Sequence, residues 1–166
     1  MYGDTLDCSL WYDNRSDNPE FPRVSKPTVT RADFQQLATV RLAEAKALLD
    51  GELWDGAYYL AGYAVEVGLK ACIIKRVQAT DAFLDRKFSE RCYTHNFVEL
   101  LELTGLKDVW KVAKAADAIF FNNWRSAIVW TEQKRYHRVT KRETNKLYDA
   151  IADTPHGVFS WIQTHW

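Results

Sequence analysis

The chain has 166 residues, enough for one domain with a sizeable core. Hydrophobic residues make up 47% of it and charged residues 27%, which is ordinary for a soluble globular protein. The 22 basic and 22 acidic residues cancel, so no overall charge attracts nucleic acid, and such binding would need a local basic patch.

Several functional classes are disfavoured by what the sequence lacks. The three cysteines, Cys8, Cys72 and Cys92, form neither a disulfide framework nor a short metal-binding pair. The N-terminus has no basic start followed by an apolar run, as a signal peptide would, and no stretch reaches the ~18 uninterrupted apolar residues of a membrane span. We therefore expect a cytoplasmic protein with reduced thiols, no metal, no cofactor and no contact with a membrane.

The first predicted element, residues 1–29, is an N-terminal arm. Three prolines interrupt its polar sequence, which favours an irregular conformation. Three of its aromatic residues, Trp11, Tyr12 and Phe21, could attach it to the body of the protein. The arm would precede a helical bundle over residues 30–166.

Two long helices are expected next. Thr30 with Asp33 three residues later is close to a capping box, and the helix that it starts ends at Gly51. The second helix is entered through Trp54 and Asp55 and carries a seam of small residues at helical spacing, which lets a partner helix approach closely. The seam consists of Ala57, Ala61, Ala64, Gly68 and Ala71.

A polar connector over 77–94 follows, and then a short helix that starts after Thr94 or Asn96. A further helix is expected over Lys107 to Phe121, followed by an irregular link over 122–140. The last helix starts at the capping box of Thr140 and Glu143 and is interrupted at Pro155. The pattern predicts an all-α fold, an up-and-down four-helix bundle with an additional short helix. His156 and His165 would lie on the last helix.

One charged pair stands inside the second apolar helix. Glu66 and Lys70 are four residues apart, in the favourable order. With apolar neighbours on both sides we expect partial burial, and a hydrogen bond from Arg125 or Arg135 is one hypothesis for how Glu66 is used. His95 is expected to cap or pack at the start of its short helix. Glu66, Lys70 and His95 would thus belong to a polar part of the core.

Three separated motifs carry a resemblance to a known family. The stretch "YYLAGYAVEVGLKACI" resembles the second-helix signature of HEPN domains, in which an AGYAVE and LK run is typical. "THNFVELLELTGL" resembles the element that follows in that family, and "WRSAIVWTEQKRYH" resembles the link before its final helix. The resemblance covers roughly residues 31–165.

The resemblance implies a small helical bundle that forms a homodimer. Many HEPN domains are metal-independent ribonucleases, often toxins or defence proteins, some are helical partners of small nucleotidyltransferases, and others only bind nucleotide or RNA. Active members carry an Arg and, a few residues later, a His near the start of the last helix. In this chain Arg138 is followed by Asn145, and no Arg there has a His at the family spacing.

The run "KRYHRVTKR", Lys134 to Arg142, is the one dense basic patch, and it leads into a predicted helix N-terminus, which favours anions. His137 could act as a base, with Arg135 and Arg138 supplying positive charge. Alternatively, these residues form a solvated link. The candidate phosphate- or nucleic-acid-binding residues are Lys134, Arg135, Tyr136, Arg138, Lys141, Arg142 and Asn145.

Three functional hypotheses follow. The first is a HEPN-like module that binds nucleotide, RNA or a nucleotidyltransferase partner through residues 134–142 and has a degenerate ribonuclease motif. The second is a metal-independent endoribonuclease of the toxin-antitoxin or defence type. The third is a pure protein-interaction subunit, with which the zero net charge is compatible.

Overall fold

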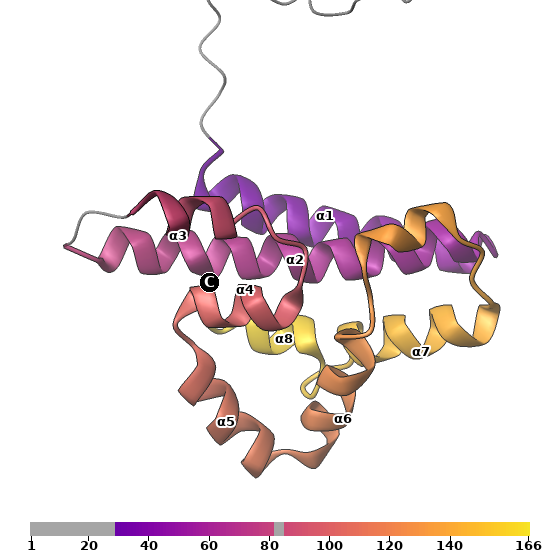
Figure 1. The fold of residues 1–166 in the computed structure, drawn as a ribbon. Coiled ribbons are helices and arrows are strands. Elements are labelled where there is room, and N and C mark those ends of the chain that lie inside the picture. Colours follow the sequence, from indigo (N-terminus) through magenta and orange to yellow (C-terminus); the bar gives the residue numbers. More distant parts are fainter. Residues whose placement is uncertain (1–28, 82–84) are drawn as a thin grey trace, which may run out of the picture.

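The computed structural model of the protein describes residues 29–81 and 85–166 (Figure 1). Within these ranges the regular structure is entirely helical, so the predicted all-α class is confirmed. All but the last residue of the predicted N-terminal arm lies outside the described residues.

The helices are α1 (Arg31–Asp50), α2 (Trp54–Ala79), α3 (Arg86–Arg91), α4 (Phe97–Thr104), α5 (Lys107–Ala116), α6 (Ala118–Ala127), the 3₁₀ helix η2 (Glu132–Tyr136), α7 (Lys141–Ala152) and α8 (Val158–Gln163). Both predicted capping boxes are present, since Thr30 and Asp33 cap α1 and Thr140 and Glu143 cap α7. The last predicted helix is interrupted as expected, between α7 and α8.

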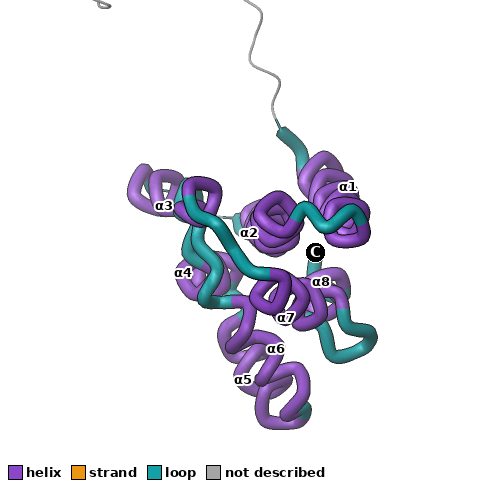
Figure 2. The backbone as a smooth tube through the Cα atoms, turned by 90° about the vertical axis from the view of Figure 1, so that its right-hand side faces the viewer, coloured by secondary structure: helices purple, strands orange, loops and turns teal. Residues whose placement is uncertain are grey.

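Helix α2 is the centre of the molecule. Viewed along the bundle, it is surrounded by α1, by α3 and α4, and by α7 and α8 (Figure 2). Its small-residue seam is buried, and α1 lies along α2 over much of its length (Figure 1). Gly68 of the seam faces Ile162 of α8. By length and composition α2 could cross a membrane, but 72% of its most apolar window is buried inside the bundle, as in the core helix of a soluble protein.

The prediction of a single helix over Lys107 to Phe121 is wrong. It divides at Asp117, whose carboxylate accepts hydrogen bonds from the backbone amides of Ile119 and Phe120 and so starts α6. Helix α6 then runs to Ala127, into the stretch predicted to be irregular. The predicted connector is also partly helical, because α2 extends to Ala79 and α3 forms after Asp85.

Because of this division, α5 and α6 are two short helices, of which α5 lies at the edge of the molecule (Figure 1) and α6 packs against α7. Helix α5 has no fully buried residue, and the apolar side chains of Val109, Val112 and Ile119 are exposed. The predicted up-and-down arrangement of four helices is therefore not confirmed.

Candidate functional site

Three polar residues predicted to belong together meet around one buried carboxylate. The side chain of Glu66 is 1% exposed. One of its oxygens accepts a hydrogen bond from the Lys70 ammonium at 2.7 Å, and the other lies 2.9 Å from Nδ1 of His95. We call Glu66, Lys70 and His95 the polar centre. The hypothesis that Arg125 or Arg135 bonds to Glu66 is wrong, because Lys70 and His95 occupy both carboxylate oxygens.

The polar centre determines how His95 is presented. A buried carboxylate is costly unless it is paired, and here a cation and an imidazole N–H satisfy it. Because Nδ1 faces Glu66, the neutral ring carries its proton on Nδ1 and leaves Nε2 as the acceptor. The helix cap expected of His95 is made by its neighbour Asn96, whose side chain accepts from the amides of Val98 and Glu99.

His95 lines a surface hollow of about 360 Å³ beside α4. Its own side chain is 43% exposed, so the imidazole is open to a ligand. The other lining residues are Thr94, Asn96, Phe97, Ile128, Trp130, Thr131 and Glu132. We call this the His95 hollow. Its polar groups are hydroxyls, an amide, a carboxylate and the imidazole, above aromatic side chains.

Trp130 anchors the link that forms one wall of the His95 hollow. Its indole stacks on Phe97 with ring centroids 5.2 Å apart, and it lies directly over the backbone of Gly62 in α2. A methyl group at Gly62 would come within 2.3 Å of the indole, so only glycine allows this approach. The small residue in α2 thereby positions the chain that leads to the basic segment.

The basic segment, Lys134–Arg142, is fastened to the start of α2 by one carboxylate. Asp55 accepts hydrogen bonds from the Val139 amide at 2.8 Å and from the Arg138 guanidinium at 2.9 Å. Both hydrogen bonds lower the pKa of Asp55, and the bond from the Val139 amide has the larger effect. Arg138 is nevertheless 96% exposed, so this pair is a surface contact.

The other predicted binding residues divide into paired and open side chains. Lys141 lies 3.6 Å from Glu52 and over the ring of Trp54. Arg135 stacks on Tyr136 with its guanidinium 4.9 Å from the ring centroid, and Tyr136 is 69% exposed. His137 and Arg142 are exposed, and Asn145 is half-buried on α7. The structure thus leaves Arg135, Tyr136, His137 and Arg142 open to solvent.

A second hollow, of about 250 Å³, collects three cations that lie far apart in the sequence. Arg125 comes from α6, Lys134 from η2 and Lys146 from α7. We call it the cationic hollow, and its other lining residues are Tyr58, Ser126, Val129, Glu143 and Leu147. Glu143 is engaged in capping α7, and its hydrogen bonds from Thr140 lower its pKa, so it stays charged and offsets part of the positive potential.

Sequence reasoning found only one of these three cations. Arg125 lay in a stretch predicted to be irregular, and nothing in the sequence placed α6 beside α7. A signal for Lys146 existed, because it lies one helical turn after Arg142 on the same face of the predicted last helix. The hollow itself depends on the packing of three elements.

The predicted catalytic residues, His137 with Arg135 and Arg138, do not form a site in which another side chain orients the histidine as a base. His137 follows η2 as an exposed residue, and no carboxylate or backbone partner for its ring is found among the described residues. His156 and His165 do not lie on helices. His156 sits between α7 and α8, bonded to Asp117 at 2.6 Å, and His165 follows α8, with Nδ1 at 2.7 Å from the carbonyl oxygen of Trp161.

Across residues 29–81 and 85–166, no three His, Cys, Asp or Glu side chains lie together as a metal-binding group would require. Comparisons with protein-family models, with curated proteins and with solved structures return no match. The HEPN resemblance therefore stays a proposal that is supported by the three sequence motifs.

Proposed function

We propose that the protein is a HEPN-like helical module that binds RNA or a nucleotide through the cationic hollow and the adjoining basic segment. The observation that carries the proposal is the convergence of Arg125, Lys134 and Lys146 on one hollow. Three cations with one carboxylate form a local positive site in a chain with no net charge, and such a site attracts phosphate groups.

The exposed part of the basic segment extends this surface. Tyr136 offers an aromatic face on which a base can stack, and the guanidinium of Arg135 already lies against it. Arg142 lies in the first turn of α7, where the unpaired amides of the helix N-terminus also favour an anion. Arg138 and Lys141 contribute less, because Asp55 and Glu52 offset their charge.

The test is binding of a labelled, mixed-sequence single-stranded RNA, followed by fluorescence anisotropy at several salt concentrations. The variant Arg125→Ala/Lys134→Ala/Lys146→Ala should bind at least tenfold more weakly. Its salt dependence should be shallower by about 2 in the slope of log K against log salt, because each phosphate contact on a single strand contributes about 0.7.

The matched control removes three cations elsewhere, in Arg86→Ala/Lys87→Ala/Lys111→Ala. Helix α3 lies at the opposite end of the molecule from the start of α7, and α5 lies apart from both (Figure 1). This control should keep its affinity and salt slope. Equal losses in the two triple variants would mean that binding follows net charge only, and the cationic hollow would have no role.

A second candidate function, a metal-independent endoribonuclease of the toxin-antitoxin or defence type, is favoured by the orientation of His95. No described residue bonds to its Nε2, which can take a proton from a ribose 2′-hydroxyl while the carboxylate of Glu66 balances the charge of the resulting imidazolium. His137 lacks such a partner among the described residues. The base would therefore be His95 rather than His137.

This candidate predicts that the purified protein cleaves RNA in EDTA, that His95→Ala abolishes cleavage, and that His137→Ala retains it. Gel electrophoresis of a mixed-sequence RNA reads out the result. Loss of cleavage in His137→Ala alone would return the role of base to His137. No cleavage by the wild type would leave the binding module.

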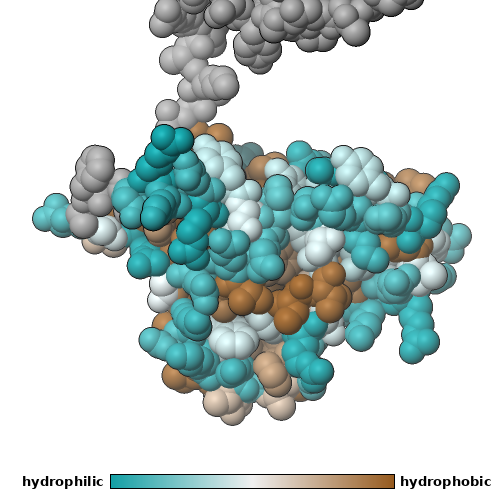
Figure 3. Space-filling model, in the orientation of Figure 1, coloured by the Kyte–Doolittle hydropathy of each residue, from teal (hydrophilic) through white to brown (hydrophobic). Residues whose placement is uncertain are grey.

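We further propose that the module acts in the cytoplasm as a homodimer or with a small nucleotidyltransferase. Support comes from exposed apolar side chains, among them Val98, Ile128 and Val129. Figure 3 shows an apolar patch on this face, over the region of α4 and the end of α6. If the protein binds neither RNA nor nucleotide, this surface would favour the remaining alternative, a pure protein-interaction subunit.

A further inference from the structure

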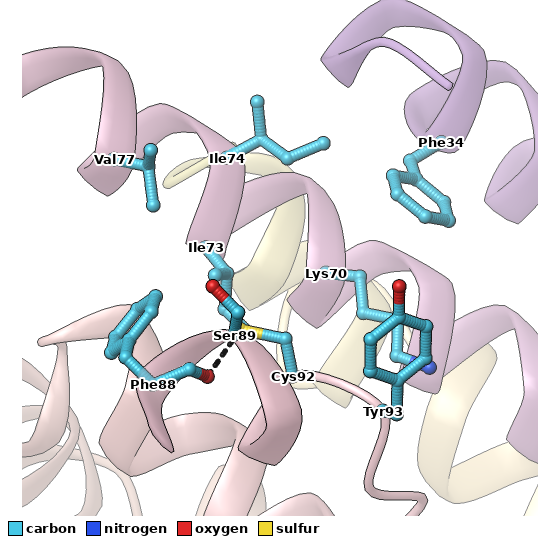
Figure 4. Close-up of a pocket in the computed structure, with 9 residues that line it drawn as sticks. All are labelled: Phe34, Lys70, Ile73, Ile74, Val77, Phe88, Ser89, Cys92 and Tyr93. Carbon is cyan, nitrogen blue, oxygen red and sulfur yellow. Dashed lines mark hydrogen bonds between the residues drawn. The ribbon is translucent and has the colours of Figure 1, made fainter. Parts of the chain in front are cut away.

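An apolar groove lies between α1, α2 and α3, apart from the two hollows (Figure 4). Its volume is about 360 Å³. Its lining residues are Phe34, Lys70, Ile73, Ile74, Val77, Phe88, Ser89, Cys92 and Tyr93. None of these residues lines the cationic hollow or the His95 hollow, and one of them, Lys70, belongs to the polar centre through its bond to the buried Glu66.

The lining of the groove defines what it can hold. Val77 of α2 points toward Phe88 at one end of the groove, and Phe34 stands over Tyr93 and Lys70 at the other end (Figure 4). Ile74 lies between Val77 and Phe34. The wall is therefore aliphatic and aromatic, and its one charged group is an ammonium. Helix α3, which forms the outer wall, carries three cations in the sequence "RKFSER". Arg86 pairs with Glu90 and Arg91 with Glu99, so Lys87 is the cation of α3 that no ion pair engages within the described residues.

Residues 4–13 of the N-terminal arm, "DTLDCSLWYD", have the complementary composition. They contain two leucines, a tryptophan and a tyrosine for the apolar wall. Their three aspartates, with no cation, complement the positive charge of Lys87 on the outer wall and can add a second partner to Lys70 and the paired arginines of α3. We propose that residues 4–13 dock in this groove of their own chain.

The connection between arm and groove permits this docking. Phe34 lies in the first turn of α1, so the arm joins the bundle at one end of the groove. The chain from Asp13 to Thr30 can span up to about 56 Å, more than the length of about 39 Å expected of the 26-residue helix α2. Because the segment is tethered at a high effective concentration, moderate contacts are enough to hold it in place.

The cysteines of the natural chain provide the test. Cys8 lies in the middle of the docking segment, Cys92 lines the groove, and Cys72 is buried. Diamide takes two electrons and two protons from a pair of thiols, so that a disulfide forms as diamide is reduced to its hydrazine. We expect a Cys8–Cys92 disulfide within one chain, identified by peptide mass spectrometry and by non-reducing electrophoresis.

The decisive comparison is with Leu10→Ser/Trp11→Ser/Tyr12→Ser, which keeps Cys8 and the tether but removes the apolar side chains. The rate of Cys8–Cys92 formation should fall at least tenfold in this variant. An unchanged rate would mean that the tether alone brings the thiols together, and the proposal would be wrong. The substitutions lie outside the described bundle, and an unchanged helical circular-dichroism spectrum confirms that the bundle itself is intact.

A second pair of variants tests the groove itself. Ile74→Glu places a carboxylate in the groove and should slow the disulfide by a similar factor, whereas Val112→Glu, on the exposed face of α5, should not. A disulfide that joins two chains, at a rate that rises with protein concentration, would show that the arm docks on a second copy and would overturn docking within the chain.

Discussion

The carboxylate of Glu66 bonds to a lysine of its own helix and to a histidine of the link between α3 and α4. Lys70 lies one helical turn along α2, and His95 comes from a part of the chain that no helical periodicity relates to α2. The lysine also lines the apolar groove, and the histidine lines the His95 hollow. A single buried residue therefore supports side chains on two different surface features.

Replacing Glu66 with Ala should destabilise the protein strongly. Removing one member of a buried ion pair typically costs about 3–5 kcal/mol, and the partial exposure of Lys70 and His95 should bring the loss toward the lower end. Urea unfolding of Glu66→Ala measures the change. Glu44→Ala, which breaks the surface pair with Arg41, is the control and should change the free energy of unfolding by less than about 1 kcal/mol. Equal stability of Glu66→Ala and wild type would contradict the pairing.

The close packing of Trp130 on Gly62 can be tested by adding one methyl group at Gly62. Gly62→Ala forces the Trp130 indole away from α2, and overpacking of this kind costs about 1–3 kcal/mol, only partly offset by the helix preference of alanine. The expected result is a lower melting temperature with altered tryptophan fluorescence. Gly56→Ala is the matched control, because its new methyl group would meet only the flexible end of Leu48, at 3.1 Å. A Gly62→Ala protein as stable as Gly56→Ala would contradict the close packing of Trp130.

At the scale of elements, Asp117 connects two parts of the fold. One oxygen caps α6, and the other accepts from His156, which lies between α7 and α8. The hydrogen bond from His156 lowers the pKa of Asp117, and the same bond raises the pKa of His156 above its ordinary value of 6.5. The pair therefore connects the start of α6 to the segment between α7 and α8.

This pair predicts a specific dependence of stability on pH. The stability that His156 contributes to the folded state is fully present below pH 6.5 and is lost as the pH rises through its raised pKa. The stability that Asp117 contributes is lost at the acid end, as the pH falls below 3.8 and through its lowered pKa. His156→Gln should therefore lower the melting temperature most near about pH 5 and least near about pH 9. His137→Gln is the control, and it should show no such profile. An equal decrease at both pH values would mean that the ion pair contributes nothing.

The same aspartate explains why one predicted helix was wrong. The apolar pattern over Lys107 to Phe121 continues without interruption, so the sequence favours a single helix. Aspartate is tolerated within helices and is preferred at their N-caps, and the pattern alone does not distinguish the two. His156, a partner 39 residues away, holds the carboxylate at the cap position. The local preferences of Thr30 and Thr140 needed no such partner, and both were predicted correctly.

At the scale of the whole molecule, α2 positions the basic segment, the His95 hollow and the apolar groove. Its first turn holds the basic segment through Asp55, its middle carries Glu66 behind His95, and its last turns form a wall of the apolar groove. Trp130 over Gly62 fixes the link that borders both hollows. Movement of the basic segment should therefore be coupled to the beginning of α2 rather than to α5, which lies at the edge.

The sequence by itself determined the all-α class, the long helices α1 and α2, the two capping boxes, the buried small-residue seam and the charged pair of Glu66 and Lys70. These features depend on periodicity and on contacts within one or two turns, which neighbouring residues specify. Only the tertiary structure decided that His95 bonds to Glu66, that Arg125 and Lys146 join Lys134, and that His137 stands apart. Each of these depends on which face of one helix packs against another, and that is set by the competition of side-chain shapes across the whole core.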